Sequence, residues 1–246
     1  MLIFTHIPRT GGTTLRSIIS GHIKNFRFID SFSEFSFIND EELNSYNFIA
    51  THCGYGIFNR ISRSHKKVII LRDPIERVIS HYFYLRNLED NVSYSSYYAK
   101  KLSIQEFIEE NNPAVQISLN NTQTWHLVKD KNIFFRKNYQ NKTNSEILDI
   151  AIDHLKTYDF IGITNDLSSV LLELNQAYGW DEVIQELPHM RESHKPDINE
   201  IDEKTINSIS KKVDLDVYVY NKTKEILKAR RIINSPESMK RKDEKW

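Results

Sequence analysis

The sequence predicts an α/β fold in three layers, with a central, mainly parallel β-sheet flanked by helices. Short apolar runs of strand length alternate along the chain with longer segments whose apolar residues recur at helical spacing. The chain has 246 residues, of which 39% are hydrophobic, and this is enough to bury a full core. We therefore expect one domain over residues 1–246, with a flexible basic tail from about residue 229.

The N-terminal part of the chain predicts three strands, two of them followed by helices. Residues 2–7 (LIFTHI) form a short apolar run, and residues 13–23 (TTLRSIISGHI) have the pattern of a helix. A second strand is expected at 46–52 (YNFIATH), and the clearest one at 66–73, where two lysines lead into an apolar run. Pro74 suits the first turn of a helix. Apolar residues follow it at helical spacing: Ile75, Val78, Ile79, Tyr82 and Leu85.

Further helices and one more strand are expected in the C-terminal part. In order, they are a short helix at 103–111, a helix at 144–158, a strand at 159–164, a helix at 166–178, a polar loop at 188–199 and a final helix at roughly 203–227. Apolar residues of the helix at 144–158 share one face, and Asn144 or Ser145 is expected to cap its N-terminus.

Composition limits the classes of partner. Acidic and basic residues balance at 33 each, so no overall field favours nucleic acid, and any anion site must be local. The single cysteine, Cys53, cannot form an internal disulfide framework or a cysteine metal cluster, and it suggests a reducing compartment. Because no apolar run is long enough to span a membrane and no signal-peptide pattern is present, we expect a cytoplasmic protein. The oligomeric state stays open.

The stretch HIPRTGGTT, residues 6–14, has the composition of an anion-binding loop between a strand and a helix. Gly11 and Gly12 lack the Cβ that would prevent backbone N–H groups from turning toward one point. The first turn of the next helix adds unpaired N–H groups and the positive end of its dipole. Further donors are available from Thr10, Thr13, Thr14 and Arg9. A Gly-Gly pair alone would indicate a simple turn, but this clustering after an apolar strand favours an anion cradle.

A second motif narrows the kind of cradle. A Walker A loop requires G-x-x-x-x-G-K-[ST], which the chain does not contain, so the cradle is not an ATPase loop. The stretch VIILRDPIERVISHYFYLR, residues 68–86, ends a predicted strand at Arg72 and places Ser80 two turns into the next helix. An arginine and a serine so placed can converge on one phosphate group.

Together the two stretches resemble the sulfotransferases that use 3′-phosphoadenosine 5′-phosphosulfate (PAPS). PRTGGTTL looks like their 5′-phosphosulfate loop, and LRDPIERVISHYFYLR looks like the 3′-phosphate motif of the carbohydrate branch, which includes the heparan and uronyl 2-O-sulfotransferases. The resemblance is strongest over about residues 1–90. It implies a P-loop-like fold, PAPS as the sulfuryl donor, adenosine 3′,5′-bisphosphate as the product, and no metal.

Position by position, the resemblance assigns six residues to the 5′-phosphosulfate: Arg9, Thr10, Gly11, Gly12, Thr13 and Thr14. It assigns Arg72 and Ser80 to the 3′-phosphate, and Lys195, in the loop RESHKPD, is expected near the same group. The family usually has lysine where this chain has Arg9. A planar guanidinium is not equivalent to a compact ammonium, so the substitution keeps the cation but changes its reach.

Sulfuryl transfer to an alcohol also needs a base that takes the proton of the acceptor hydroxyl. His52 directly follows a predicted strand, where open α/β sheets bind their ligands. Its segment, ATHCGYG, resembles the GHxxYG stretch of carbohydrate sulfotransferases, whose histidine is the proposed base. We therefore expect His52 and Arg9 to be catalytic, although a histidine at a strand end is often structural. The chain has nine histidines that compete for this role. His6 could instead pack against or orient the cradle, His81 could be partly buried on its helix, and His126 and His189 could contact the substrate.

The expected function is thus a PAPS-dependent O-sulfotransferase that acts on a carbohydrate or small alcohol, with no nucleic-acid partner and no membrane span. The alternatives are an atypical P-loop kinase and a nucleotide- or glycan-binding module without catalysis. Trp125 could offer a stacking face for a sugar, or pack in the core or a lid. The basic tail, Lys228 to Lys245, could attract an anionic polymer or simply be a solvated, frayed end.

Overall fold

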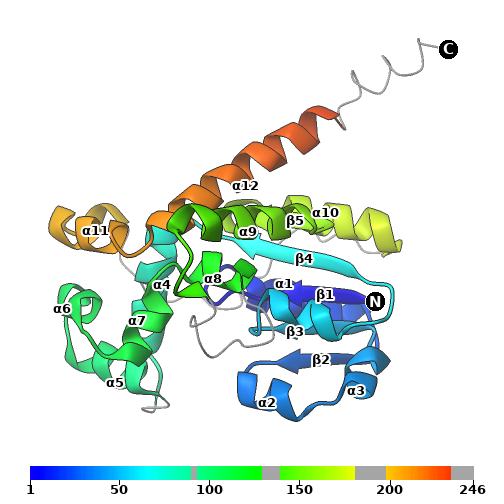
Figure 1. Ribbon diagram of the computed structural model, residues 1–246, viewed down its shortest axis with the longest axis horizontal. Coiled ribbons are helices and arrows are strands. Elements are labelled where there is room, and N and C mark those ends of the chain that lie inside the picture. The colour runs from blue at the N-terminus through cyan, green and yellow to red at the C-terminus, as the bar shows by residue number, and fades with distance from the viewer. Residues whose placement is uncertain (90–92, 129–138, 181–197, 234–246) are drawn as a thin grey trace.

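The computed structural model describes residues 1–89, 93–128, 139–180 and 198–233, and these build a five-stranded parallel sheet (Figure 1). The order across the sheet is β2 (Phe26–Ile29), β3 (Phe48–Thr51), β1 (Leu2–Thr5), β4 (Lys66–Leu71) and β5 (Phe160–Ile163). Leu2 of β1 pairs with Phe48 on one side and with Lys66 on the other. All strands run in the same direction, so their C-terminal ends lie at one edge of the sheet.

Helices connect and flank the strands. Those of the described residues are α1 (Gly12–His22), α2 (Phe32–Phe37), α3 (Asp40–Ser45), α4 (Pro74–Arg86), α5 (Tyr94–Lys101), α6 (Ile104–Glu109), α7 (Pro113–Leu119), α8 (Thr122–Val128), α9 (Asn144–Lys156), α10 (Leu167–Tyr178), α11 (Glu203–Ser210) and α12 (Asp214–Ile233). The short 3₁₀ helices are η1 (Tyr55–Arg60), η3 (Thr164–Asp166) and η4 (Ile198–Glu200).

Alternation along the strands divides the core between two faces of the sheet. Leu2 and Phe4 of β1 belong to a buried cluster with residues of α1 and α10. Ile3 belongs to a second cluster with residues of α8, α9 and α12. A third cluster joins α4, α5, α6, α7 and α11, which lie beyond the arrowheads of β1 and β4 in Figure 1. The predicted three-layer α/β fold with a parallel sheet is confirmed, and a helical group adjoins its C-terminal edge.

The prediction of one continuous helix over roughly residues 203–227 was wrong, because this segment forms two helices, α11 and α12. Asn121 caps the second of them from a distant part of the chain. Its Oδ1 accepts from the N–H groups of Leu215 and Asp216, at 3.0 and 3.1 Å. Side-chain oxygens stabilise helix starts by this means, so the break at 211–213 depends on a tertiary contact.

The helix expected at 144–158 forms as α9, but its cap was predicted wrongly. Thr143 is the N-cap, and it forms a capping box with Glu146 in which each side chain bonds the other residue's N–H. Most of the loop expected at 188–199 lies outside the described residues, and its last two positions begin η4.

Candidate active site

The loop between β1 and α1 curls because two of its residues have left-handed backbone conformations. Arg9 has a φ of 72° and Gly11 a φ of 84°, and Thr10 between them is fully buried. The Thr10 hydroxyl donates to the Ile7 carbonyl at 3.0 Å, and the Thr10 carbonyl accepts from Thr164 Oγ1 at 3.0 Å. A left-handed conformation is uncommon for an arginine, and such residues cluster at functional sites. Thr10 therefore shapes the loop from inside.

The glycines allow this loop to lie against its neighbours. A Cβ on Gly12 would be 1.9 Å from Cδ2 of His6, since the imidazole packs directly against the start of α1. Gly11 is the N-cap of α1 and has no side chain with which to occupy the N–H groups of the first turn. Thr13 and Thr14 lie half-buried in this turn. The loop and the helix start, called the cradle below, therefore present backbone N–H groups of the kind that bind anions at other helix starts.

The two sequence motifs meet at Arg9. Its Nε donates to Ser80 Oγ at 3.1 Å, and its guanidinium carbon lies 4.7 Å from the centre of the Tyr84 ring. Arg72 donates from Nη1 to the Arg9 carbonyl at 3.2 Å and from Nη2 to a carboxylate oxygen of Glu76 at 3.0 Å. Because β1 and β4 are neighbouring parallel strands, the residues after their C-terminal ends come together. Arg9, Arg72 and Ser80 therefore form one cluster beside the cradle.

A buried network behind this cluster fixes the backbone of Arg72. The Arg72 N–H donates to Gln123 Oε1 at 2.9 Å, and Gln123 Nε2 donates to the Arg72 carbonyl at 2.8 Å. Asp216 is fully buried and accepts from the N–H of Gln123 at 3.1 Å and from the N–H and hydroxyl of Thr124, both at 2.7 Å. Burial raises the pKa of Asp216, and the nearby Arg77 acts in the opposite direction. The sequence analysis missed this network. Its one signal in the local sequence is Asp216, an acidic residue on the apolar side of a helical pattern.

His52 lies on the other side of the cradle, directly after β3. Its Nδ1 is 2.5 Å from the His6 carbonyl oxygen, and the two imidazole rings are 4.5 Å apart. A carbonyl oxygen can only accept, so Nδ1 must carry the proton of this hydrogen bond. The other ring nitrogen, Nε2, is the one that can accept a proton, and it lies 3.7 Å from Oδ1 of Asp30. The same oxygen of Asp30 accepts from Arg16 of α1 at 2.8 Å.

This arrangement places the loop between β1 and α1, a pair of arginines and an oriented histidine at the C-terminal edge of a parallel sheet. A model of the sulfotransferase family matches residues 1–229. The chain belongs to the sulfotransferase family. The match reaches from β1 into α12, so the resemblance seen near the N-terminus extends over most of the chain. No curated protein matches the chain significantly.

Other histidines of this sulfotransferase are less suited to accept a proton from an acceptor. Burial lowers the pKa of His81 to about 3, and the charges of Arg77 and Arg9 act in the same direction. His6 and His126 are buried, and Nδ1 of His126 bonds a backbone carbonyl of its own helix, α8. Two predicted residues lie outside the described ranges: His189 and Lys195.

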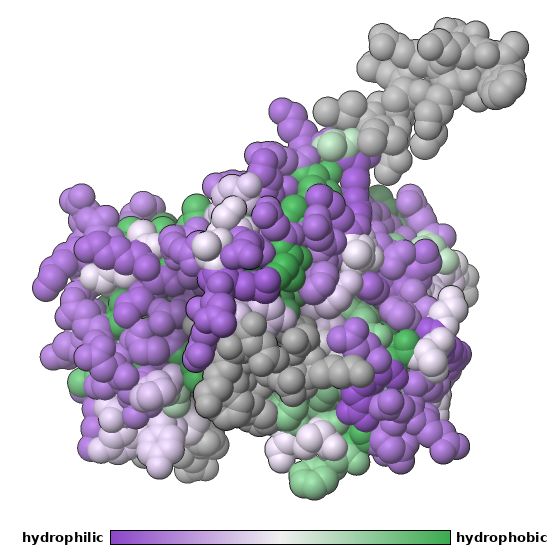
Figure 2. Space-filling view, viewed as in Figure 1, coloured by the Kyte–Doolittle hydropathy of each residue, from purple (hydrophilic) through white to green (hydrophobic). Residues whose placement is uncertain are grey.

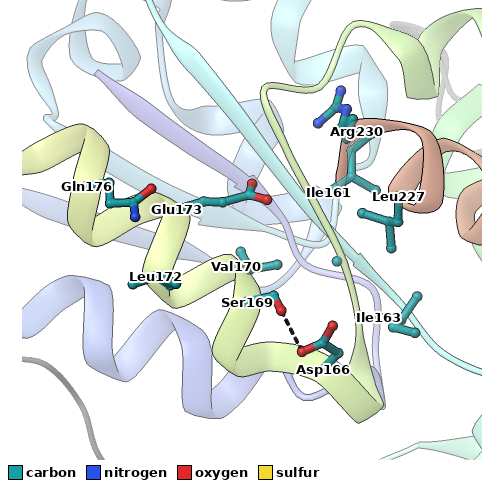
Figure 3. Close-up of a pocket in the computed structure, with 11 residues that line it drawn as sticks. Ile161, Ile163, Asp166, Ser169, Val170, Leu172, Glu173, Gln176, Leu227 and Arg230 are labelled. Atoms are coloured by element: carbon teal, nitrogen blue, oxygen red, sulfur yellow. Dashed lines mark hydrogen bonds between the residues drawn. The ribbon is translucent and has the colours of Figure 1, made fainter. Parts of the chain in front are cut away.

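A groove of about 290 Å³ lies between β5, α10 and α12 (Figure 3). Its floor is apolar and formed by β5. On one side lie Asp166, the N-cap of α10, and Ser169 and Glu173 of the same helix, and Arg230 of α12 lies on the other side. None of the predicted site residues lines it, so the groove is separate from the cradle. Trp125 is half-buried and packs edge-on against Tyr139, with ring centres 5.8 Å apart, next to the core of the sheet.

The described residues contain neither a cluster of metal ligands nor a membrane-spanning helix. Among the described residues, no three or more His, Cys, Asp and Glu side chains gather as a metal site would require. Within the same residues, no helix combines the length and the apolar character needed to cross a bilayer. On the face drawn in Figure 2, hydrophilic residues predominate over α11 and along α12.

Proposed function

We propose that this sulfotransferase transfers the sulfuryl group of PAPS to a hydroxyl group of a carbohydrate or small alcohol, with His52 as the general base. The observation that supports this proposal is the meeting of Arg9, Arg72 and Ser80 at a cradle that shares His6 with His52. A cytoplasmic location, which the single cysteine predicts, belongs to the same proposal.

The cradle and the two arginines fit the anionic groups of the donor. The N–H groups at the start of α1 and the guanidinium of Arg9 would hold the 5′-phosphosulfate, while Arg72 and Ser80 would hold the 3′-phosphate. When bound, PAPS supplies a sulfuryl group joined to a phosphate, which is a good leaving group. Arg9 contributes most in the transition state, where negative charge develops on the leaving phosphate. Charges and dipoles that are already fixed in place need little reorganisation to stabilise this charge.

The acceptor side of the site depends on the tautomer of His52. With Nδ1–H donated to the His6 carbonyl, Nε2 is the ring nitrogen without a proton, and in this proposal it takes the proton of the acceptor hydroxyl. The imidazole side chain is 26% exposed, so an acceptor can reach it, while its contact with His6 fixes the direction of the ring. The bond to the carbonyl also stabilises the imidazolium that forms when the proton arrives.

The experiment incubates the protein with labelled PAPS and a panel of methyl glycosides and simple alcohols, and measures transfer of the label. Thermal unfolding with adenosine 3′,5′-bisphosphate, AMP and ATP with Mg²⁺ is measured in parallel. We expect transfer to at least one hydroxyl acceptor and the largest rise in Tm with the bisphosphate. Phosphoryl transfer from ATP would favour a kinase, and bisphosphate binding without any transfer would favour a binding module.

Arg72→Ala tests the 3′-phosphate assignment. A charge-assisted hydrogen bond contributes about 1.5–3 kcal/mol, so the variant should lose most of the preference for the bisphosphate over AMP. Arg86→Ala, at the exposed end of α4, serves as the matched control and should keep the preference. Equal affinity of the wild-type protein for the two nucleotides would refute the assignment.

A further inference from the structure

Tyr84 lies on α4 beside Arg9, the residue that the proposed function places at the leaving phosphate. The centre of its ring is 4.7 Å from the guanidinium carbon of Arg9, a distance at which a cation is attracted to an aromatic face. Ser80, four residues earlier on the same helix, accepts from Arg9 Nε at 3.1 Å. Residues four apart on a helix lie on one side of it, one turn from each other. Both contacts to Arg9 therefore come from one face of α4.

The ring of Tyr84 is itself held by the helical group. It is half-buried and packs against the apolar cluster that joins α4, α5, α6, α7 and α11. The start of α4 is fixed as well, because the carboxylate of Asp73 accepts from the N–H groups of Ile75 and Glu76. The surface against which Arg9 lies is thus part of a packed helix and not of a loop.

The side chain of Arg9 needs a support of this kind. Its backbone lies in the loop between β1 and α1, and Arg72 bonds the Arg9 carbonyl at 3.2 Å, but this bond holds the backbone and not the guanidinium. A long side chain loses entropy when it is fixed, and a cation stabilises a developing charge best when it is already in place. Ser80 holds one edge of the guanidinium, and Tyr84 covers one face.

We propose that Tyr84 is a positioning residue, whose ring holds the guanidinium of Arg9 in the orientation that meets the 5′-phosphosulfate of the donor. The aromatic face acts, and the hydroxyl group does not. The tyrosine works through Arg9, so it matters for nucleotides with an anion at the 5′ position and not for those without one. This inference rests on the proposed function, because it takes Arg9 to bind the 5′ group.

Two nucleotides separate positioning from a general structural role. Adenosine 3′,5′-bisphosphate carries a 5′-phosphate, whereas adenosine 3′-monophosphate lacks it and keeps the 3′-phosphate. If Tyr84 only stabilised the helical group, its removal would weaken the binding of both nucleotides by a similar factor. If it holds Arg9, its removal weakens the binding of the bisphosphate alone. The ratio of the two Kd values, measured by calorimetry, needs no turnover.

The variants remove the ring, the hydroxyl group or a comparable tyrosine. Tyr84→Leu removes the aromatic face and keeps an apolar side chain, while Tyr84→Phe keeps the face and removes the hydroxyl. Tyr98→Leu is the matched control, since Tyr98 is also half-buried against the same cluster but contacts the ring of Tyr97. Tyr84→Leu is also combined with Arg9→Ala in a double-mutant cycle.

In Tyr84→Leu, the Kd for the bisphosphate should rise about threefold to thirtyfold, the range that a cation–π contact supplies, and the Kd for the 3′-monophosphate should change less than about twofold. Tyr84→Phe should retain the wild-type ratio because it retains the ring, and so should Tyr98→Leu. With Arg9→Ala already present, Tyr84→Leu should add less than about twofold, because no guanidinium is left to position. With an acceptor in hand, kcat should fall in Tyr84→Leu as well, since charge on the leaving phosphate is greatest in the transition state.

Three results would overturn the inference: an unchanged ratio in Tyr84→Leu, an equal loss for both nucleotides, or a loss in Tyr84→Phe as large as in Tyr84→Leu. If Tyr84→Leu does not fold, Tyr84→Met, which also lacks a ring, is held to the same expectation. An unchanged ratio in Arg9→Ala would refute the assignment of Arg9 to the 5′ group and the inference with it. Absence of sulfuryl transfer to every acceptor, with the expected ratios, would refute the enzymatic function and leave the role of Tyr84 intact.

Discussion

The backbone carbonyl of His6 determines which nitrogen of His52 can act. Because it accepts from Nδ1, the proton of the neutral ring is fixed on the side away from Asp30. At Arg9, the guanidinium donates from Nε to Ser80 and lies over the Tyr84 ring. The planar guanidinium of Arg9 makes both contacts at once, whereas the compact ammonium of a lysine would keep the charge with a different reach.

His52→Ala removes the proposed base and leaves every residue of the cradle in place, although the ring contact with His6 is lost. General-base catalysis typically contributes about 10²–10⁴-fold, so kcat should fall by that factor while the affinity for adenosine 3′,5′-bisphosphate stays the same. His65→Ala is the control, because Nδ1 of His65 also contacts a backbone carbonyl, that of Arg63, at 2.9 Å. Steady-state kinetics and calorimetric nucleotide titration measure the two effects. A His52→Ala enzyme within a few-fold of wild type would move the base to another residue.

At the scale of an element, the start of α1 is determined by the space between the helix and His6. Gly12→Ala would place a Cβ 1.9 Å from the His6 ring, so the ring or the helix must shift and the cradle must change shape. We expect lower stability, by about 1–3 kcal/mol, and weaker bisphosphate binding, measured by chemical denaturation and calorimetry. Gly21→Ala tests the same exchange in the same helix, where nothing lies within 4 Å. That variant should bind normally and gain about 0.4–1 kcal/mol.

Helix α4 carries a histidine that makes stability depend on pH. The pKa of His81 is about 3 in the folded chain, against about 6.5 for a free histidine, because burial disfavours its charged form. As the pH falls below about 6.5, the unfolded chain binds a proton that the folded chain does not, so stability falls. The loss of unfolding free energy from about pH 8 to about pH 5 should be about 2 kcal/mol smaller in His81→Leu. An unchanged loss in urea unfolding would contradict this. His154, whose pKa burial also lowers, contributes to the remaining slope.

Elements were predictable where their signals are local. β4 and α4 were expected correctly, since an apolar run, Pro74 and helical periodicity all lie within the segment itself. β2 was missed because this edge strand has four residues, pairs on one side and leaves Phe26 42% exposed, so its pattern is not that of a buried strand. The start of α12 was missed because its cap, Asn121, comes from a distant segment. No local pattern encodes such a contact.

At the scale of the whole molecule, the candidate site joins the sheet to the helical group beyond its edge. Arg72 follows β4, Gln123 belongs to α8, and Asp216 belongs to α12. The sequence places the loop at residues 6–14, both arginines and His52 in motifs or at strand ends, and the structure brings them to one edge of the sheet; their roles stay predictions. The sequence could not predict the network of Gln123 and Asp216, because these residues become neighbours of Arg72 only after the layers have assembled.

Asp216→Asn tests whether this network supports nucleotide recognition. The carboxylate accepts three hydrogen bonds in a buried place, and the amide can replace only part of them, so the variant should lose about 1–3 kcal/mol of unfolding free energy. Because Gln123 then holds the Arg72 backbone less firmly, the preference for the bisphosphate over AMP should also fall. Asp149→Asn, at an exposed position of α9, should change neither beyond about 0.5 kcal/mol. Full nucleotide preference in Asp216→Asn would show that Arg72 needs no such support.

The contact between Thr164 and the cradle has a consequence for the order of folding. Its hydroxyl reaches the carbonyls of Thr10, 154 residues away along the chain, and of Leu71. Parallel strands can pair only after long stretches of chain have closed into loops, and such topologies fold slowly. The loop between β1 and α1 therefore cannot take its final shape until the segment after β5, late in the chain, has arrived beside it. Anion affinity should consequently be one of the last properties to appear during refolding, and on a ribosome it should await synthesis of at least two thirds of the polypeptide.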